Sequence, residues 1–180
     1  MARVEIELNP VDHITTDAIG QPGQRVFYIQ GVQGEQTVTL IVEKLQIQTL
    51  SLGVEEFLLE LRGRFPELED TTTDYEEDQM RIQPPVDPLF RVGELALGYD
   101  RDTDRVMILA REVLDSGSEE PQEGEPAGSE VRFWCTRNQL LAMSRWGLEV
   151  SGRGRPICPY CGQPMEPSGH FCPKRNGYKH

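Results

Sequence analysis

The stretch VTLIVEKLQIQTLS (residues 38–51) has a counterpart in VRFWCTRNQLLAMS (residues 131–144), and this pair decides the fold that the sequence predicts. The two stretches align at a constant offset of 93 residues, at which Lys44 meets Arg137. Each begins with apolar and β-branched residues that favour a strand, and each continues with apolar residues at helical spacing. Both stretches therefore predict a strand that leads directly into a helix.

The residues upstream of these stretches correspond as well. GQRVFYIQ (23–30) follows a proline-glycine turn, and TDRVMILA (103–110) follows an acidic turn. Both read as strands that begin after a tight turn. The order of features is thus strand, turn, strand, loop, strand, helix, and it occurs twice. We predict two repeats of this pattern, at about 11–65 and 88–150.

The predicted helices carry recognisable signals. Thr136 and Gln139 have the spacing of a capping box, in which each side chain satisfies a backbone N–H at the helix start. An additional strand, RVEIEL (3–8), opens the chain. We expect an α+β fold in which two βββα repeats form one antiparallel sheet or barrel with two helices packed on it. The first helix should bury an apolar stripe of Ile47, Leu50, Val54, Phe57, Leu58 and Leu61.

Two acidic segments, 66–87 and 115–129, interrupt this body. Both lack apolar periodicity, and the second is low in complexity, so we predict a mobile loop there. The body then spans residues 1–150, and a cysteine-rich tail spans residues 151–180.

The net charge of −12 is distributed unevenly. Residues 151–180 carry five cationic side chains and one acidic one, a net charge of +4, which leaves −16 for residues 1–150. An acidic body repels nucleic acids and anionic membranes, whereas the tail could contact RNA or fold back on the body. The apolar runs are too short to cross a bilayer, and the N-terminus lacks a signal-peptide pattern, so we expect a cytoplasmic protein.

The tetrapeptide CPYC (158–161) admits two interpretations. It is the active-site sequence of glutaredoxin-type thiol exchange, which requires a cysteine at a helix N-terminus early in a thioredoxin-like domain. It is also half of a zinc knuckle. Only 19 residues follow Cys161, and Gly162 and Pro164 disfavour a helix there, so the context favours metal.

Cys172 supplies a third thiol, and His170 is the simplest fourth ligand because alternate residues of an extended segment can converge on one ion. Four ligands within so short a stretch predict a closed structural Zn²⁺ site rather than a catalytic one. The predicted ligands are Cys158, Cys161, His170 and Cys172, and the alternatives for the fourth position are His180, Cys135 and His13.

Established catalytic sequence patterns do not occur in the chain, and no catalytic residue is predicted. Cations near the predicted helix starts and strand starts could bind an anion such as phosphate. These weaker candidates are Lys44 and Arg137 at the strand-to-helix junctions, and Arg25 and Arg105 at equivalent strand positions.

Four segments resemble a family of uncharacterised bacterial proteins, found largely in actinobacteria, with two repeats and a cysteine-rich C-terminal tail. The matching segments are AIGQPGQRVFYIQ (18–30), VTLIVEKLQIQ (38–48), FRVGELALGYD (90–100) and CPYCGQPMEPSGHFCPKRNGY (158–178). The resemblance implies a zinc-binding tail but no reaction.

Three hypotheses for function follow from these patterns. The first is a non-catalytic binding or adaptor module with a structural zinc site and a protein partner. The second is an enzyme or sensor that acts on a small phosphorylated ligand at the strand-helix junctions. The third is RNA binding through the basic tail.

Overall fold

A computed structural model describes residues 3–114, 128–165 and 169–175 of the chain. It contains seven strands and two long helices, together with two short 3₁₀ turns at Glu77–Met80 and Pro173–Arg175. The strands are β1 (Glu5–Leu8), β2 (His13–Ile19), β3 (Val26–Gln33), β4 (Gln36–Val42), β5 (Pro88–Asp100), β6 (Arg105–Glu112) and β7 (Glu130–Cys135). The helices are α1 (Lys44–Arg64) and α2 (Arg137–Gly152).

All seven strands belong to one sheet, in the order β1-β7-β6-β5-β4-β3-β2. The mixed α+β class, the opening strand and the two helices are confirmed. The prediction of a purely antiparallel sheet was wrong, because β4 pairs with β5 and β1 pairs with β7 in parallel. The chain reaches β5 from β4 only after α1 and the segment 65–87, and such a long crossover permits parallel pairing.

The element order strand-strand-strand-helix occurs twice, as β2-β3-β4-α1 and as β5-β6-β7-α2. Within each half the strands pair antiparallel with their sequence neighbours. An internal duplication stays a prediction, although two residues that are 93 positions apart, Ser51 and Ser144, are in contact. Ser144 in α2 donates a hydrogen bond of 3.0 Å to the carbonyl of Ser51 in α1, where the helices cross.

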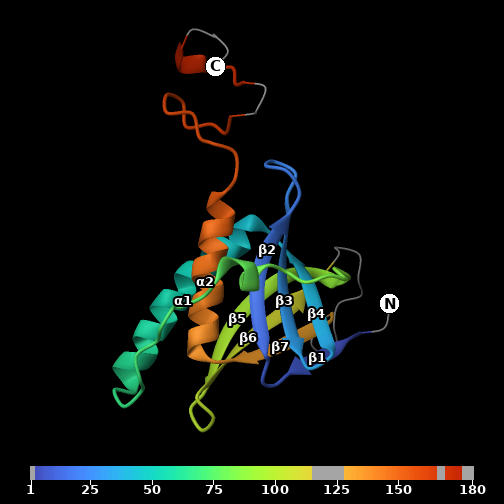
Figure 1. Ribbon diagram of the computed structural model, residues 1–180, viewed down its shortest axis with the longest axis vertical. Helices are drawn as coiled ribbons and strands as arrows, with labels where there is room; N and C mark the ends of the chain where they lie inside the picture. The colour runs from blue at the N-terminus through green and yellow to red at the C-terminus, as the bar shows by residue number, and fades with distance from the viewer. Residues whose placement is uncertain (1–2, 115–127, 166–168, 176–180) are drawn as a thin grey trace.

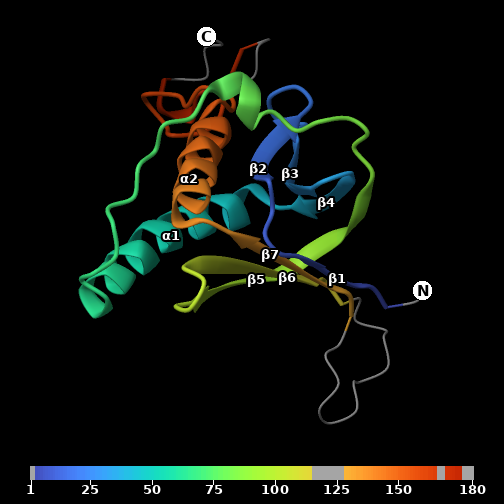
Figure 2. The same cartoon turned by 60° about the horizontal axis from the view of Figure 1, so that its bottom comes forward.

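The sheet is curled so that its two edge strands approach each other. β1 and β2 lie at opposite ends of the strand order, but only residues 9–12 separate them in the chain. This connector donates from the Val11 N–H to the carbonyl of Trp134 and from the Asp12 N–H to that of Val32, each at 2.8 Å. Figure 2 shows the result as two wings, one of β2, β3 and β4 and one of β5, β6, β7 and β1.

The wings pack against each other at Gly31 in β3. A Cβ atom built on Gly31 would lie 2.5 Å from two ring carbons of Phe133 in β7 and 3.5 Å from Leu8 in β1. Phe133 and Leu8 have no exposed surface. Because interiors are close-packed, an aromatic ring can occupy this position only where the facing residue lacks a side chain.

The helices lie side by side on one side of the sheet (Figure 1). The predicted capping box of α2 is confirmed, since Thr136 Oγ1 accepts from the Gln139 N–H and the Gln139 side chain accepts from the Thr136 N–H. The predicted apolar stripe of α1 is buried at Ile47, Leu50, Val54 and Leu61 and half-buried at the two remaining positions.

The acidic segment 66–87 forms an extended strap across the sheet and α2 rather than a peripheral loop. Buried polar side chains hold its backbone. Thr15 Oγ1 donates to the carbonyl of Met80, and the Gln30 amide group both donates to and accepts from the backbone of Gln83, at 3.0 and 2.8 Å. The second predicted acidic loop lies outside the described residues apart from its last two positions.

Arg137 fixes the start of α2 to the β5–β6 turn and to the strap. Its guanidinium donates to both carboxylate oxygens of Asp104, at 2.8 and 3.0 Å, and to the carbonyl of Glu69 at 2.7 Å. The hydrogen bonds from Arg137 lower the pKa of Asp104. Burial, followed by the hydrogen bond to Asp104, raises the pKa of Tyr99 to about 12.

The Gly31–Phe133 contact predicts a destabilising effect from a single added methyl group. Gly31→Ala should lower the free energy of unfolding by about 2 kcal/mol, because overpacking forces the Phe133 ring or β3 to move. Gly63→Ala is the matched control, since Gly63 is an exposed helical position with open space around it, and it should raise stability by about 0.5–1 kcal/mol. Urea denaturation would measure both. Equal stability of the Gly31→Ala variant and the wild type would contradict the packing described here.

The Asp104 pair predicts a pH-dependent contribution to stability. Asp104→Asn should lower the free energy of unfolding by about 1 kcal/mol at pH 7. This value is smaller than that of a buried pair because the carboxylate is half-exposed and solvent screens it. Asparagine tolerates the φ of 47° at this position, so the turn is preserved. Because the folded state lowers the pKa of Asp104, the stabilisation is fully present above the ordinary value of 3.8 and is lost as the pH falls through the lowered folded-state pKa. A wild-type-minus-variant difference in stability that did not decrease at all as the pH falls below 3.8 would contradict this assignment.

Candidate functional site

The tail reverses direction in a short hairpin that presents CPYC at its turn. Ile157 and Pro164 form an antiparallel bridge, and the Cys158 N–H donates to the carbonyl of Gln163 at 2.8 Å. Gly162 adopts a φ of 73°, which glycine reaches without strain, and its N–H donates to the carbonyl of Cys158 at 2.9 Å. This geometry places Cys158 and Cys161 on one side of the turn.

The four predicted metal ligands converge in the structure. The ligand atoms of Cys158, Cys161, His170 and Cys172 all lie within 4.8 Å of one another. The sulfurs of Cys158 and Cys172 are 3.8 Å apart, and Cys161 Sγ is 3.0 Å from His170 Nε2. Two thiolates bound at the usual 2.3 Å around a tetrahedral zinc ion would be separated by about 3.8 Å. The cluster therefore has the donor set and the dimensions of a closed metal site.

The knuckle turn favours a thiolate at one of these cysteines. Hydrogen bonding from the backbone N–H of Cys161, supported by that of Tyr160, lowers the pKa of Cys158 to about 6. Burial raises the pKa of Cys161. A deprotonated sulfur is the form that binds a metal ion, so the turn prepares the first ligand for coordination.

The alternatives for the fourth ligand lie elsewhere or outside the described residues. Cys135 is completely buried in the core of the body, and burial raises the pKa of its thiol to about 12. His13 lies in β2, where burial lowers its pKa and its Nε2 has no hydrogen-bond partner among the described residues. His180 lies outside the described residues. Thiol exchange also lacks its structural setting, because Cys158 precedes a turn rather than a helix.

Arg153, the first cation of the tail segment, caps the C-terminal end of α2 and pairs with carboxylates of the body. Its guanidinium pairs with Glu77 of the strap at 3.0 Å and with Glu149 of α2 at 2.5 Å. It also lies over the ring of Trp146, 4.9 Å from the ring centroid. This cation therefore neutralises acidic groups of the same chain.

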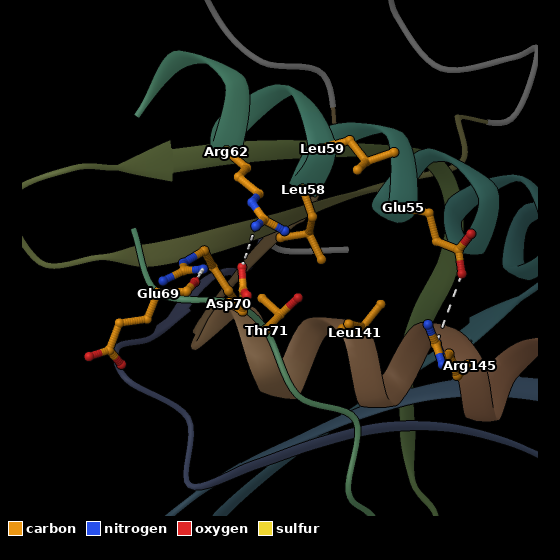
Figure 3. A pocket seen from close by; sticks show the side chains of 10 residues that line it. Glu55, Leu58, Leu59, Arg62, Glu69, Asp70, Thr71, Leu141 and Arg145 are labelled. Atoms are coloured by element: carbon orange, nitrogen blue, oxygen red, sulfur yellow. Dashed lines mark hydrogen bonds and ion pairs between the residues drawn. The ribbon is translucent and has the colours of Figure 1, made fainter. Parts of the chain in front are cut away.

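A cavity of about 220 Å³ lies between α1, α2 and the strap (Figure 3). Its cationic side chains are engaged by carboxylates. Arg62 pairs with Asp70 at 2.9 Å, Arg145 pairs with Glu55 at 3.9 Å, and Arg137 pairs with Asp104 outside the lining. Arg137 therefore offers an anion much less charge than its position at the helix start suggested.

The structure brings Arg25 and Lys44 together in a different cavity. This basic pocket has a volume of about 240 Å³ and also contains Arg155, a residue that the sequence did not single out. Arg105 lies at the start of β6, beside Asp104, and is not part of the pocket lining.

A stripe of exposed leucines on α1 was not predicted as a functional feature. Leu45, Leu52 and Leu59 are 71%, 65% and 71% exposed. Their spacing of seven residues places them on one face of the helix, opposite the buried stripe. Leu45 also lines a groove of about 650 Å³ between α1 and β5, together with Leu95 and Leu97. The spacing was visible in the sequence, but only burial distinguishes it from a core stripe.

Among the described residues, no helix has both the length and the apolar character needed to span a membrane. Comparisons with curated proteins and with solved structures yield no match. A comparison with protein families matches residues 6–172 to a family described as "Protein of unknown function (DUF3090)". The match covers the body from residue 6 onward and all four cysteine and histidine residues of the tail cluster. The chain belongs to this DUF3090 family.

Proposed function

We propose that the chain is a non-catalytic protein-binding module whose tail is folded by one structural zinc ion. The observation that carries the proposal is the exposed leucine stripe on α1, Leu45, Leu52 and Leu59. Apolar surface of this kind, adjacent to a groove and bordered by charged residues, marks protein interaction sites. An amphipathic partner segment could place its own apolar residues against the stripe and in the α1–β5 groove.

The donor chemistry of the tail supports zinc as the ion. Three sulfurs and one imidazole form a soft to borderline donor set, and the tetrahedral spacing suits an ion without a geometric preference of its own. Four protein ligands leave no open position for substrate or water. The tail is too short to bury an apolar core, so metal coordination would provide most of its folding free energy.

Zinc coordination predicts a defined pattern of thiol reactivity. Native mass spectrometry should find one zinc ion per chain, and none of the four cysteines should react with a thiol reagent in the folded, metal-loaded protein. A chelator should expose three thiols, because Cys158, Cys161 and Cys172 then lose their metal. The fourth, Cys135, should react only after denaturation, since it is buried in the body. Rapid reaction of Cys158 in a protein that binds no metal would refute the site and favour thiol exchange.

The leucine stripe predicts a partner interaction that is lost without loss of stability. In affinity capture from the native host, the double variant Leu45→Ser/Leu52→Ser should retain a stoichiometric protein partner at least tenfold less well than the wild type. The control is Leu89→Ser, which truncates another exposed leucine that is not part of the stripe or the groove. Urea denaturation should show similar stability for both variants. Capture that is unaffected by the double variant, or reduced equally by the control, would contradict this docking face.

A further inference from the structure

The basic pocket lies where three parts of the chain meet. The turn before β3 contributes Arg25, the first residue of α1 is Lys44, and the start of the tail contributes Arg155. The remaining lining residues are Gly23, Phe27, Gly154, Ile157 and Pro164, so the lining contains three cations and no carboxylate. The metal-binding hairpin supplies one wall, since Ile157 and Pro164 are its bridged pair.

Two adjacent cations without a carboxylate at ion-pair distance among the described residues, Arg25 and Lys44, are unusual in a chain with a net charge of −12. Most arginines that the structure describes pair with a carboxylate, as Arg62, Arg111 and Arg153 do. Within the described residues, neither Arg25 nor Lys44 has a carboxylate at ion-pair distance. Glu43, which precedes Lys44, is paired with Arg91 instead.

Arg25 is held in place by groups that leave its charge intact. Its Nη1 donates to the carbonyl of Val150 at 2.8 Å, and its guanidinium lies 5.0 Å from the ring centroid of Phe27. Carbonyl and aromatic contacts fix the orientation of a guanidinium but carry no formal negative charge. The guanidinium is therefore positioned before any ligand arrives.

Gly154 leaves the space between the two cations open. A Cβ atom built on this glycine would lie 3.1 Å from Arg25 Nη2 and 3.5 Å from Lys44 Nζ. These two nitrogens are consequently no more than 6.6 Å apart, the sum of the two distances. Two like charges at this separation repel each other, and an anion that contacts both would remove the repulsion. The N-terminal end of α1 adds a partial positive charge beside Lys44.

In the second half of the chain, the cation at the helix start, Arg137, is neutralised by a carboxylate. The sequence correspondence that pairs Arg25 with Arg105 places Gln24 opposite Asp104, the carboxylate that binds Arg137 in the second half. The first half thus has a cation at the helix start, Lys44, but an amide in place of the carboxylate that would neutralise it.

We propose that the basic pocket binds the phosphate group of a small molecule, with Arg25 and Lys44 as its principal contacts and the metal-binding tail as one wall. A phosphate dianion matches two neighbouring cations better than a monovalent carboxylate does, and guanidinium groups bind its oxygens in a defined geometry. The volume of about 240 Å³ accommodates a phosphate group and a small attached moiety.

Isothermal titration of the zinc-loaded chain with inorganic phosphate, a sugar phosphate and a nucleoside monophosphate tests the proposal. Binding of at least one of these should be weakened at least tenfold by Lys44→Gln, an exposed position whose replacement leaves the fold intact. Gly154→Ala should weaken it similarly, because the methyl group occupies the space between the cations. Arg64→Gln is the control, since it removes one cation from the other end of α1 and should change the affinity less than twofold.

Each result has a definite meaning. Absence of binding at millimolar concentrations of all three probes would overturn the proposal, as would equal weakening by Lys44→Gln and Arg64→Gln. Tighter binding of one ester than of inorganic phosphate would identify the source of the phosphate group. Zinc content should be the same in all variants, so a lost phosphate site is distinguishable from a lost metal site. If the chain takes up no zinc and still binds phosphate in a way that depends on Lys44, the metal assignment is refuted and the phosphate pocket is retained.

Discussion

The short connection between the two edge strands is the constraint on which the rest of the structure depends. Four residues, 9–12, join β1 to β2, although these strands occupy opposite ends of a seven-stranded sheet. The sheet must therefore curl until its edges nearly meet, and the connector completes the curl by bonding to β7 and to β3. Curling brings β3 and β7 face to face, which is why β3 carries Gly31 where β7 carries Phe133. The helices cover the side that the curled sheet leaves open, and their crossing at Ser51 and Ser144 positions the two strand-helix junctions.

The polar interior explains how an acidic, loop-like segment becomes part of this structure. Thr15, Asp17 and Gln30 are buried on β2 and β3. The Thr15 and Gln30 side chains donate hydrogen bonds to backbone carbonyls of residues 80–83, and the Asp17 carboxylate accepts one from a backbone N–H of the same segment. Burying such groups without partners would be costly, so the strap and the sheet require each other. In the tail, polar groups are likewise satisfied by nearby backbone: N–H groups of the hairpin lower the pKa of Cys158, and Cys161, His170 and Cys172 lie around it.

The features that the sequence predicted are those that local chemistry determines. The capping box of Thr136 and Gln139, the apolar stripe of α1 and the CPYC turn all depend on residues within a few positions of one another. Features that depend on distant segments were not predicted. The parallel pairing of β4 with β5 has no local signal, and neither does the approach of Arg155 to Arg25 and Lys44. The sequence did not predict that the first acidic segment is bound to the body. Its composition describes the strap itself but not the buried side chains of β2 and β3 that bond to it.

The two strand-helix junctions illustrate how one arrangement can serve different purposes. In the second half, Arg137 and Asp104 form a bidentate pair that joins α2, a turn and the strap, so the charge at the helix start contributes to stability. In the first half, Lys44 also begins a helix, the predicted repeat aligns Gln24 with Asp104, and the nearby Arg25 is anchored by carbonyl groups. Two neighbouring like charges lower the folding free energy gained, and in the part of the chain that the structure describes no carboxylate lies at ion-pair distance from either Arg25 or Lys44. A site that keeps such a cost, beside a glycine that preserves space between the charges, is better explained by an external anion than by a structural role.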